Sequence, residues 1–185
     1  MVIRPHIMAA MRNLITTTLF AFVALLSVAA GGASAWAQGI ERLGDFDDWS
    51  AFRFTESGNK ACYMASQPVK AEGNYTKRGD IYALVTHRPA ENRRDEVSFI
   101  AGYSFRENST VQVAIGGQGF QLFTSEDGAW TANKDEDQKL VQAMIKGNRM
   151  VVKGTSLRGT ATTDTYSLKG FTSAYQAITD TCGLQ

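Results

Sequence analysis

The sequence contains few of the residues from which hydrolytic and metal sites are usually built. Its 185 residues include only two histidines. His6 lies in an N-terminal segment that we expect to be removed, which leaves His87 as the single imidazole. One imidazole excludes a multi-histidine metal site and allows at most one histidine base. No serine lies in a G-x-S-x-G motif, so we expect His87 to be a hydrogen-bonded residue at the end of a strand.

An excess of charge of one sign is also absent. The chain carries 19 lysines and arginines against 18 aspartates and glutamates. Loss of residues 1–37 would remove Arg4 and Arg12 but no acid, so the remaining chain is nearly neutral. Such a chain lacks the basic surface that attracts nucleic acids or anionic lipids. We therefore expect neither as a partner, and no motif calls for a cofactor.

No hydrophobic run is long enough to cross a membrane. The longest apolar stretch, Leu19–Ala30, is short of the roughly 20 residues that a spanning helix needs. Basic residues precede it and small residues follow it, which predicts a secretory signal peptide over residues 1–37. Cleavage is expected after Ala37, with Ala35 as the second choice; an uncleaved anchor is the alternative. Residues 38–185 are then expected to form one domain in the periplasm, associated with the outer membrane or secreted.

Cysteine is scarce, and both cysteines lie in the exported part. Cys62 and Cys182 would meet an oxidising compartment, so we expect them to form a disulfide. A redox-active thiol would instead need a C-x-x-C pair or a neighbouring base, and the sequence shows neither. The predicted bridge ties the end of the chain to an early strand.

The sequence patterns predict a mainly β protein. Strands are indicated from Trp49 onward, and the clearest alternation of apolar and polar residues runs from Val97 to Phe105. The period changes over Asp135–Asn148, which predicts one amphipathic helix in mid-chain. A capping-box spacing from Ser173 predicts a short C-terminal helix, while the polar stretch Lys70–Gly79 is predicted as a loop. With no βαβ alternation, we expect an antiparallel two-sheet sandwich with two helices.

Four segments together resemble the invasion-associated locus B family of exported alphaproteobacterial proteins. They are Ala61–Pro68, Val85–Pro89, Glu96–Phe105 and Ser156–Ile178, in that order along the chain. The resemblance implies an immunoglobulin-like β-sandwich in the periplasm or at the outer membrane. In pathogenic members it also implies a contribution to virulence, through entry into host cells. It supplies no catalytic residues and no cofactor.

Two kinds of short motif are typical of binding sites in other proteins. Arg78, Gly79 and Asp80 spell the tripeptide known for integrin recognition, which makes them a candidate interaction site; a turn that opens a strand explains them equally well. The acidic runs Asp45–Asp48 and Asp135–Asp137 lack the glycine and distal glutamate of a calcium loop. We interpret the acidic runs as solvated turns and expect no metal.

Three hypotheses for function follow. The first is a non-enzymatic envelope protein that binds other envelope components or, in a pathogen, host surfaces; it predicts an exposed apolar or aromatic patch. The second is a binding module for a saccharide or peptide, which predicts a hollow lined by residues such as Trp130 or Tyr103. The third is a hydrolase, which predicts a polar cleft at His87 or at a pair of carboxylates.

Overall fold

The computed structural model describes residues 39–184, which contain eleven strands and two α-helices. The predicted signal peptide, residues 1–37, lies outside the described residues. The strands are β1 (Glu41–Phe46), β2 (Trp49–Glu56), β3 (Asn59–Ser66), β4 (Lys70–Gly73), β5 (Tyr82–Arg88), β6 (Arg93–Ile100), β7 (Thr110–Ile115), β8 (Gln118–Ser125), β9 (Gly128–Trp130), β10 (Arg149–Thr155) and β11 (Ala161–Ser167). The helices are α1 (Lys134–Lys146) and α2 (Phe171–Cys182), and a 3₁₀ turn spans Pro89–Glu91.

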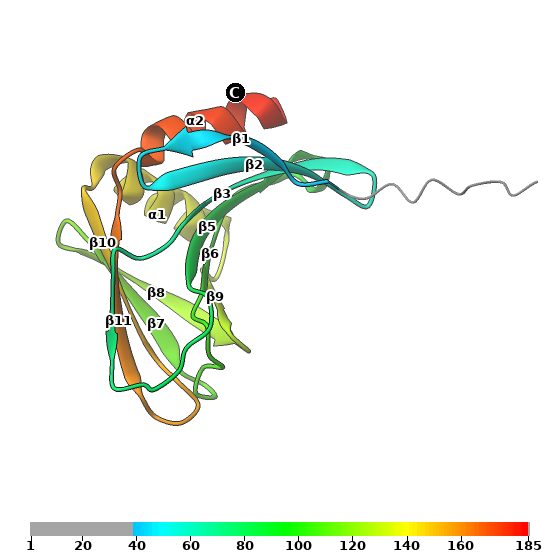
Figure 1. The fold of residues 1–185 in the computed structure, drawn as a ribbon. Coiled ribbons are helices and arrows are strands. Elements are labelled where there is room, and N and C mark those ends of the chain that lie inside the picture. The colour runs from blue at the N-terminus through cyan, green and yellow to red at the C-terminus, as the bar shows by residue number, and fades with distance from the viewer. Residues whose placement is uncertain (1–38, 185) are drawn as a thin grey trace, which may run out of the picture. The chain divides into compact units, whose positions relative to one another are not determined.

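All eleven strands belong to one antiparallel sheet (Figure 1). Their order is β1-β2-β3-β5-β6-β9-β8-β7-β10-β11-β4. The predicted fold class, mainly β and antiparallel with two helices, is confirmed. The two layers are halves of a single sheet, because the short strand β9 pairs with β6 on one side and with β8 on the other. A sequence pattern indicates strands but not this pairing, which is why two separate sheets were predicted.

Side chains alternate between the two faces along every long strand, and one face forms the core. Its fully or nearly fully buried members include Trp49, Met64, Val85, Val97, Phe99, Val113, Leu122, Met150 and Tyr166. Phe99 of β6 contacts Tyr166 of β11, with ring centroids 6.2 Å apart, so the two halves of the sheet share this core. Both helices pack on the same face. The rings of Phe171 on α2 and Trp49 on β2 are nearly perpendicular, with their centroids 4.9 Å apart.

Helix α2 is attached at both ends. It starts directly after Gly170, whose φ is +83° and where an added Cβ would lie 1.9 Å from the carbonyl oxygen of Phe46. Only glycine fits that position, and glycine has no side chain that could cap the helix. The helix therefore starts at Phe171 without a side-chain cap. The capping box predicted from Ser173 is wrong. At the other end Cys182 is bonded to Cys62 of β3, with Cα atoms 6.1 Å apart. The predicted disulfide is confirmed.

The structure corrects two strand predictions. Strand β6 ends at Ile100 instead of Phe105, because Gly102 takes a φ of +69° and accepts a backbone hydrogen bond from Gly79. The stretch predicted as a loop from Lys70 contains the edge strand β4, which pairs with β11. Its four residues are all exposed, so no alternation revealed it.

Candidate functional site

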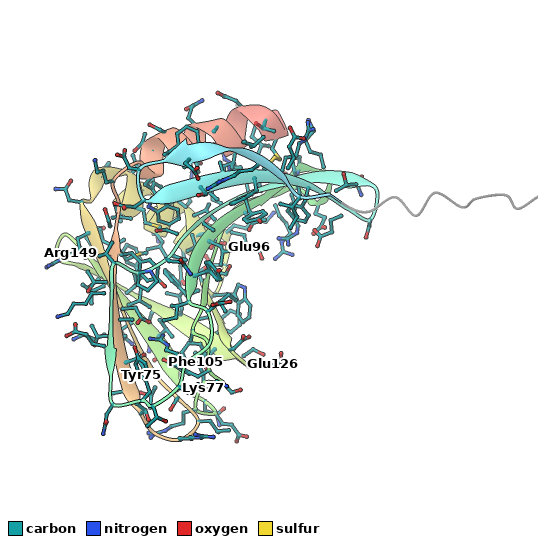
Figure 2. All side chains as sticks on the ribbon, viewed as in Figure 1. Tyr75, Lys77, Glu96, Phe105, Glu126 and Arg149 are labelled. Carbon is teal, nitrogen blue, oxygen red and sulfur yellow. A yellow bond between two sulfur atoms is a disulfide. The ribbon has the colours of Figure 1, made fainter. Side chains whose placement is uncertain are left out.

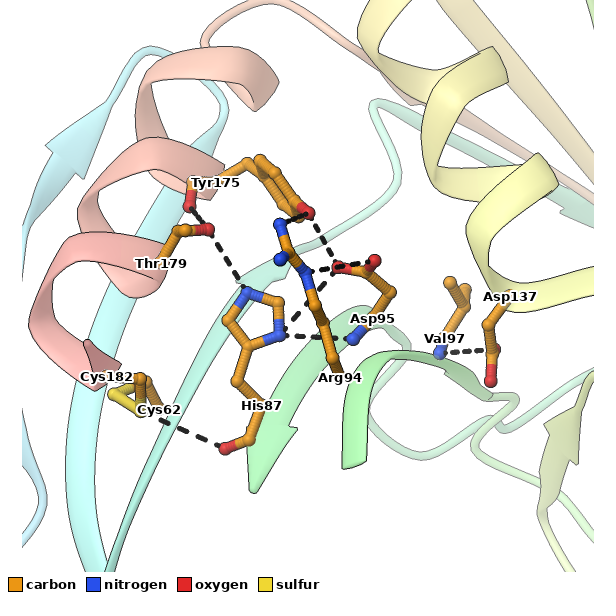
Figure 3. Close-up of polar contacts among 9 residues, drawn as sticks. All are labelled: Cys62, His87, Arg94, Asp95, Val97, Asp137, Tyr175, Thr179 and Cys182. Atoms are coloured by element: carbon orange, nitrogen blue, oxygen red, sulfur yellow. Dashed lines mark hydrogen bonds and ion pairs between the residues drawn. A yellow bond between two sulfur atoms is a disulfide. The ribbon is translucent and has the colours of Figure 1, made fainter. Parts of the chain in front are cut away.

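His87 lies in a closed polar cluster between β5, β6 and α2 (Figure 3). Its side chain is fully buried. The ring Nδ1 accepts a hydrogen bond from the backbone N–H of Asp95 at 3.1 Å, so the proton resides on Nε2. That nitrogen donates to Thr179 Oγ1 at 3.3 Å, and Thr179 donates in turn to the carbonyl oxygen of Tyr175 at 2.7 Å. The cluster therefore fixes a single neutral tautomer.

The electrostatics of the cluster also favour the neutral ring. Burial lowers the pKa of His87; the nearby Asp95 carboxylate acts in the opposite direction and Arg94 in the same direction. Asp95 is itself occupied, since its Oδ1 accepts from the Tyr175 hydroxyl at 2.6 Å. Both ring nitrogens are engaged and the ring has no exposed surface, so His87 acts as a bridge between the sheet and α2.

The candidate interaction residues Arg78, Gly79 and Asp80 do not form a free loop tip. The Arg78 guanidinium makes two hydrogen bonds of 2.6 Å each to the Asp164 carboxylate. The two side chains are only 4% and 6% exposed. The ring of Tyr103 lies 4.9 Å from the guanidinium carbon. Gly79 and Asp80 are exposed, but the arginine that such a motif presents to a partner is turned into the protein.

The outward face of the sheet carries aromatic side chains on the side opposite the helices. Side chains that meet the helices, such as Trp49 and Cys62, point to the inner face, so their neighbours along the strands point outward. Leu140 of α1 and Ile178 of α2 belong to the same buried core as Trp49, so both helices cover the inner face. We call the outward set on the other side the open face: Phe52, Tyr63, Tyr82, Leu84, Phe123 and Trp130.

The strand register joins Leu84 to the aromatic pair Trp130 and Phe123 through Ser98. Leu84 pairs with Ser98, Ser98 with Trp130, and Trp130 with Phe123. The rings of Phe123 and Trp130 lie 5.9 Å apart, and Phe123 is 50% exposed. Glu96 of β6 also lies on this face, and Figure 2 shows its position. Of these residues only Trp130 was predicted to line a site, although the alternation on β2, β3 and β5 carried the signal for the others.

Two hollows adjoin the open face, and a third lies beside Tyr103. The first, of about 680 Å³, lies over Phe52, Tyr63 and Tyr82. The second, of about 440 Å³, is lined by Trp130 and Phe123 together with residues at the start of α1. The third, of about 580 Å³, includes Tyr103. Trp130 and Tyr103 thus line hollows, as the small-ligand hypothesis requires.

Acidic side chains of both runs bind other groups of the protein. Asp137 accepts a hydrogen bond from the backbone N–H of Val97 at 2.8 Å, and burial raises the pKa of its carboxyl group. Asp47 forms an ion pair with Lys169 at 2.8 Å. Within residues 39–184 no group of three or more histidine, cysteine or acidic side chains is arranged to hold a metal ion. The same residues include no helix with the length and apolar character to cross a membrane.

Fold and surface together define a disulfide-closed, antiparallel β-sheet protein with its helices on one face and aromatic side chains on the other. The chain belongs to the Invasion associated locus B (IalB) protein family, whose sequence model matches residues 49–179. It is similar in structure to the crystal structure of invasion associated protein B from Bartonella henselae. The two structures match with a TM-score of 0.51 at 14% sequence identity. The match covers 75% of this chain and 95% of the Bartonella henselae chain. No curated protein matches the sequence.

Proposed function

We propose that this protein is an exported, non-enzymatic component of the cell envelope that acts by binding another molecule through its open face. The observation that carries the proposal is the two groups of aromatic side chains on the outward face of the sheet, one around Tyr63 and one around Trp130, with the helices on the other side. Patches of this kind mark binding sites in proteins that are otherwise well covered. The N-terminal signal pattern and the cysteine pairing support an exported location.

The polar cluster supports a binding role over the hydrolase hypothesis. A general base must reach a substrate proton directly or through one water. His87 instead contacts Asp95 and Thr179 through its two nitrogens and has no exposed surface. Its hydrogen bonds hold α2 against the sheet, which is a structural task.

The partner is expected among envelope components, and on the host surface if the source organism is a pathogen. The name of the Bartonella henselae protein associates that protein with invasion. A fold shared at 14% identity carries no partner with it. The proposal therefore depends on the surface of this chain.

Site-specific photocrosslinking in intact cells tests the proposal. A photoreactive amino acid replaces Phe123 on the open face, and in a matched strain it replaces Gln142, an exposed residue of α1. We expect discrete crosslinked species from position 123 and none from position 142. Equal labelling from both positions, or no species from position 123, would contradict the use of the open face. Fractionation of the same cells checks the exported location.

A further inference from the structure

The hollow of about 680 Å³ over Phe52, Tyr63 and Tyr82 has a chemical character that the rest of the open face lacks. Its floor is aromatic and comes from β2, β3 and β5. The rings of Phe52 and Tyr63 are stacked, with centroids 4.8 Å apart and planes 15° from parallel. The volume falls in the range of roughly 300–1,000 Å³ that is typical of ligand sites.

The wall of this hollow is polar and ordered by its own hydrogen bonds. Asp45 Oδ1 accepts from Ser50 Oγ at 2.6 Å and also from the Arg42 guanidinium. Arg42 Nη2 lies 3.3 Å from Ser50 Oγ as well. Asp48 and Gln67 complete the wall with a carboxylate and an amide. The wall therefore offers planar groups that can bind pairs of neighbouring hydroxyl groups.

The backbone beneath the hollow is not available to a ligand. Strands β2, β3 and β5 each have a hydrogen-bonded neighbour on both sides, in the order β1-β2-β3-β5-β6. An extended peptide that binds by adding a strand needs a free edge, and this floor has none. Recognition must come from side chains alone, which disfavours a peptide. The charged wall disfavours a hydrocarbon chain, because its carboxylates would lose water without gaining a partner.

We infer that this hollow binds a saccharide that carries no acidic groups. A sugar ring has an apolar C–H face that suits an aromatic floor and a rim of hydroxyl groups that suits a polar wall. Asp45, Asp47 and Asp48 line the hollow together with Arg42. Asp45 pairs with Arg42 and Asp47 with Lys169, so Asp48 leaves the wall with a net negative charge. This excess of negative charge repels uronic acids and phosphorylated sugars and accepts neutral or amino sugars. The inference rests on the proposed function, since it names a ligand for one end of the open face.

Titration calorimetry of the exported chain with three oligosaccharides tests the inference. The probes are cellotetraose, tetraglucosamine and trigalacturonate, which are neutral, basic and acidic. We expect binding of the neutral or the basic probe with a dissociation constant below about 1 mM and no binding of the acidic one. Tyr63→Ala should weaken binding at least about tenfold, whereas Gln142→Ala, at an exposed position of α1 away from the open face, should leave it unchanged.

Tyr63→Ala could lose affinity by unfolding, so Asp48→Lys provides a second variant at an exposed position. It should weaken binding of tetraglucosamine with no loss of thermal stability. Binding of trigalacturonate alone, affinity that survives Tyr63→Ala, or no binding of any probe would each overturn the inference. If position 123 still crosslinks a partner in cells, the proposed function stands without the saccharide. If neither experiment gives a signal, both fail.

Discussion

Loss of the bridge between Cys62 and Cys182 should destabilise the fold strongly. The two cysteines are 120 residues apart in sequence. In the chain-entropy model a cross-link that closes a loop of this length destabilises the unfolded state by about 5 kcal/mol. A domain of this size loses roughly 2–4 °C of melting temperature for each kcal/mol. Reduction should therefore lower the melting temperature by about 10–20 °C.

Urea denaturation of three samples separates the cross-link from the packing of its sulfurs. The samples are the oxidised protein, the same protein reduced, and the double variant Cys62→Ala/Cys182→Ala. Reduced protein keeps both sulfur atoms, so most of the loss should already appear there and the double variant should add little. The m-value should rise in both, because an unfolded chain without the cross-link exposes more surface. Free energies of unfolding that agree within about 1 kcal/mol between the oxidised and reduced samples would refute the reasoning.

Three further predictions concern stability. Arg78→Met leaves the buried Asp164 carboxylate unpaired and should cost about 3–5 kcal/mol in urea denaturation, more than the double variant Arg78→Met/Asp164→Leu. Because burial lowers the pKa of His87, the unfolded state takes up the proton, and stability should fall as pH drops below about 6.5. His87→Gln should remove that part of the slope, which is at most about 1.4 kcal/mol per pH unit. Gly170→Ala should destabilise far more than Gly183→Ala in thermal melts, because only the first added Cβ meets backbone.

Each of these predictions has a contrary outcome. A double variant that is less stable than Arg78→Met would show that the salt bridge is not the reason for the loss. Equal pH slopes for wild type and His87→Gln would place the titration elsewhere. Similar melting temperatures for the two glycine variants would mean that α2 shifts to accept a methyl group at position 170.

Local patterns predicted the parts of the fold that local physics determines. Helix α1 spans Lys134–Lys146, close to the predicted Asp135–Asn148, because its apolar period and acidic first turn are both local signals. The disulfide followed from compartment and from the presence of only two cysteines, which required no knowledge of the fold.

The candidate site could not be predicted in the same way, because it depends on register. Phe52 pairs with Tyr63 across β2 and β3. Tyr82 of β5 reaches the same hollow only through the antiparallel pairing of β3 with β5. Arg78 and Asp164 are 86 residues apart in sequence. The tripeptide alone therefore could not predict that the arginine is buried in a pair with Asp164. Long-range pairing decides these contacts, and a single sequence does not encode it in any local pattern.

Alternation along the central strands separates the requirements of folding from those of binding. On β3, Cys62 and Met64 point into the core, while Tyr63 between them points outward. Substitutions at inward positions remove buried volume and are felt by the whole fold. Outward positions are free of that constraint and can change without altering the sheet. A structure at 14% identity shares this fold at a TM-score of 0.51, so the fold persists while most side chains change. If the proposed function holds, the specificity of this chain is expected to follow its outward residues.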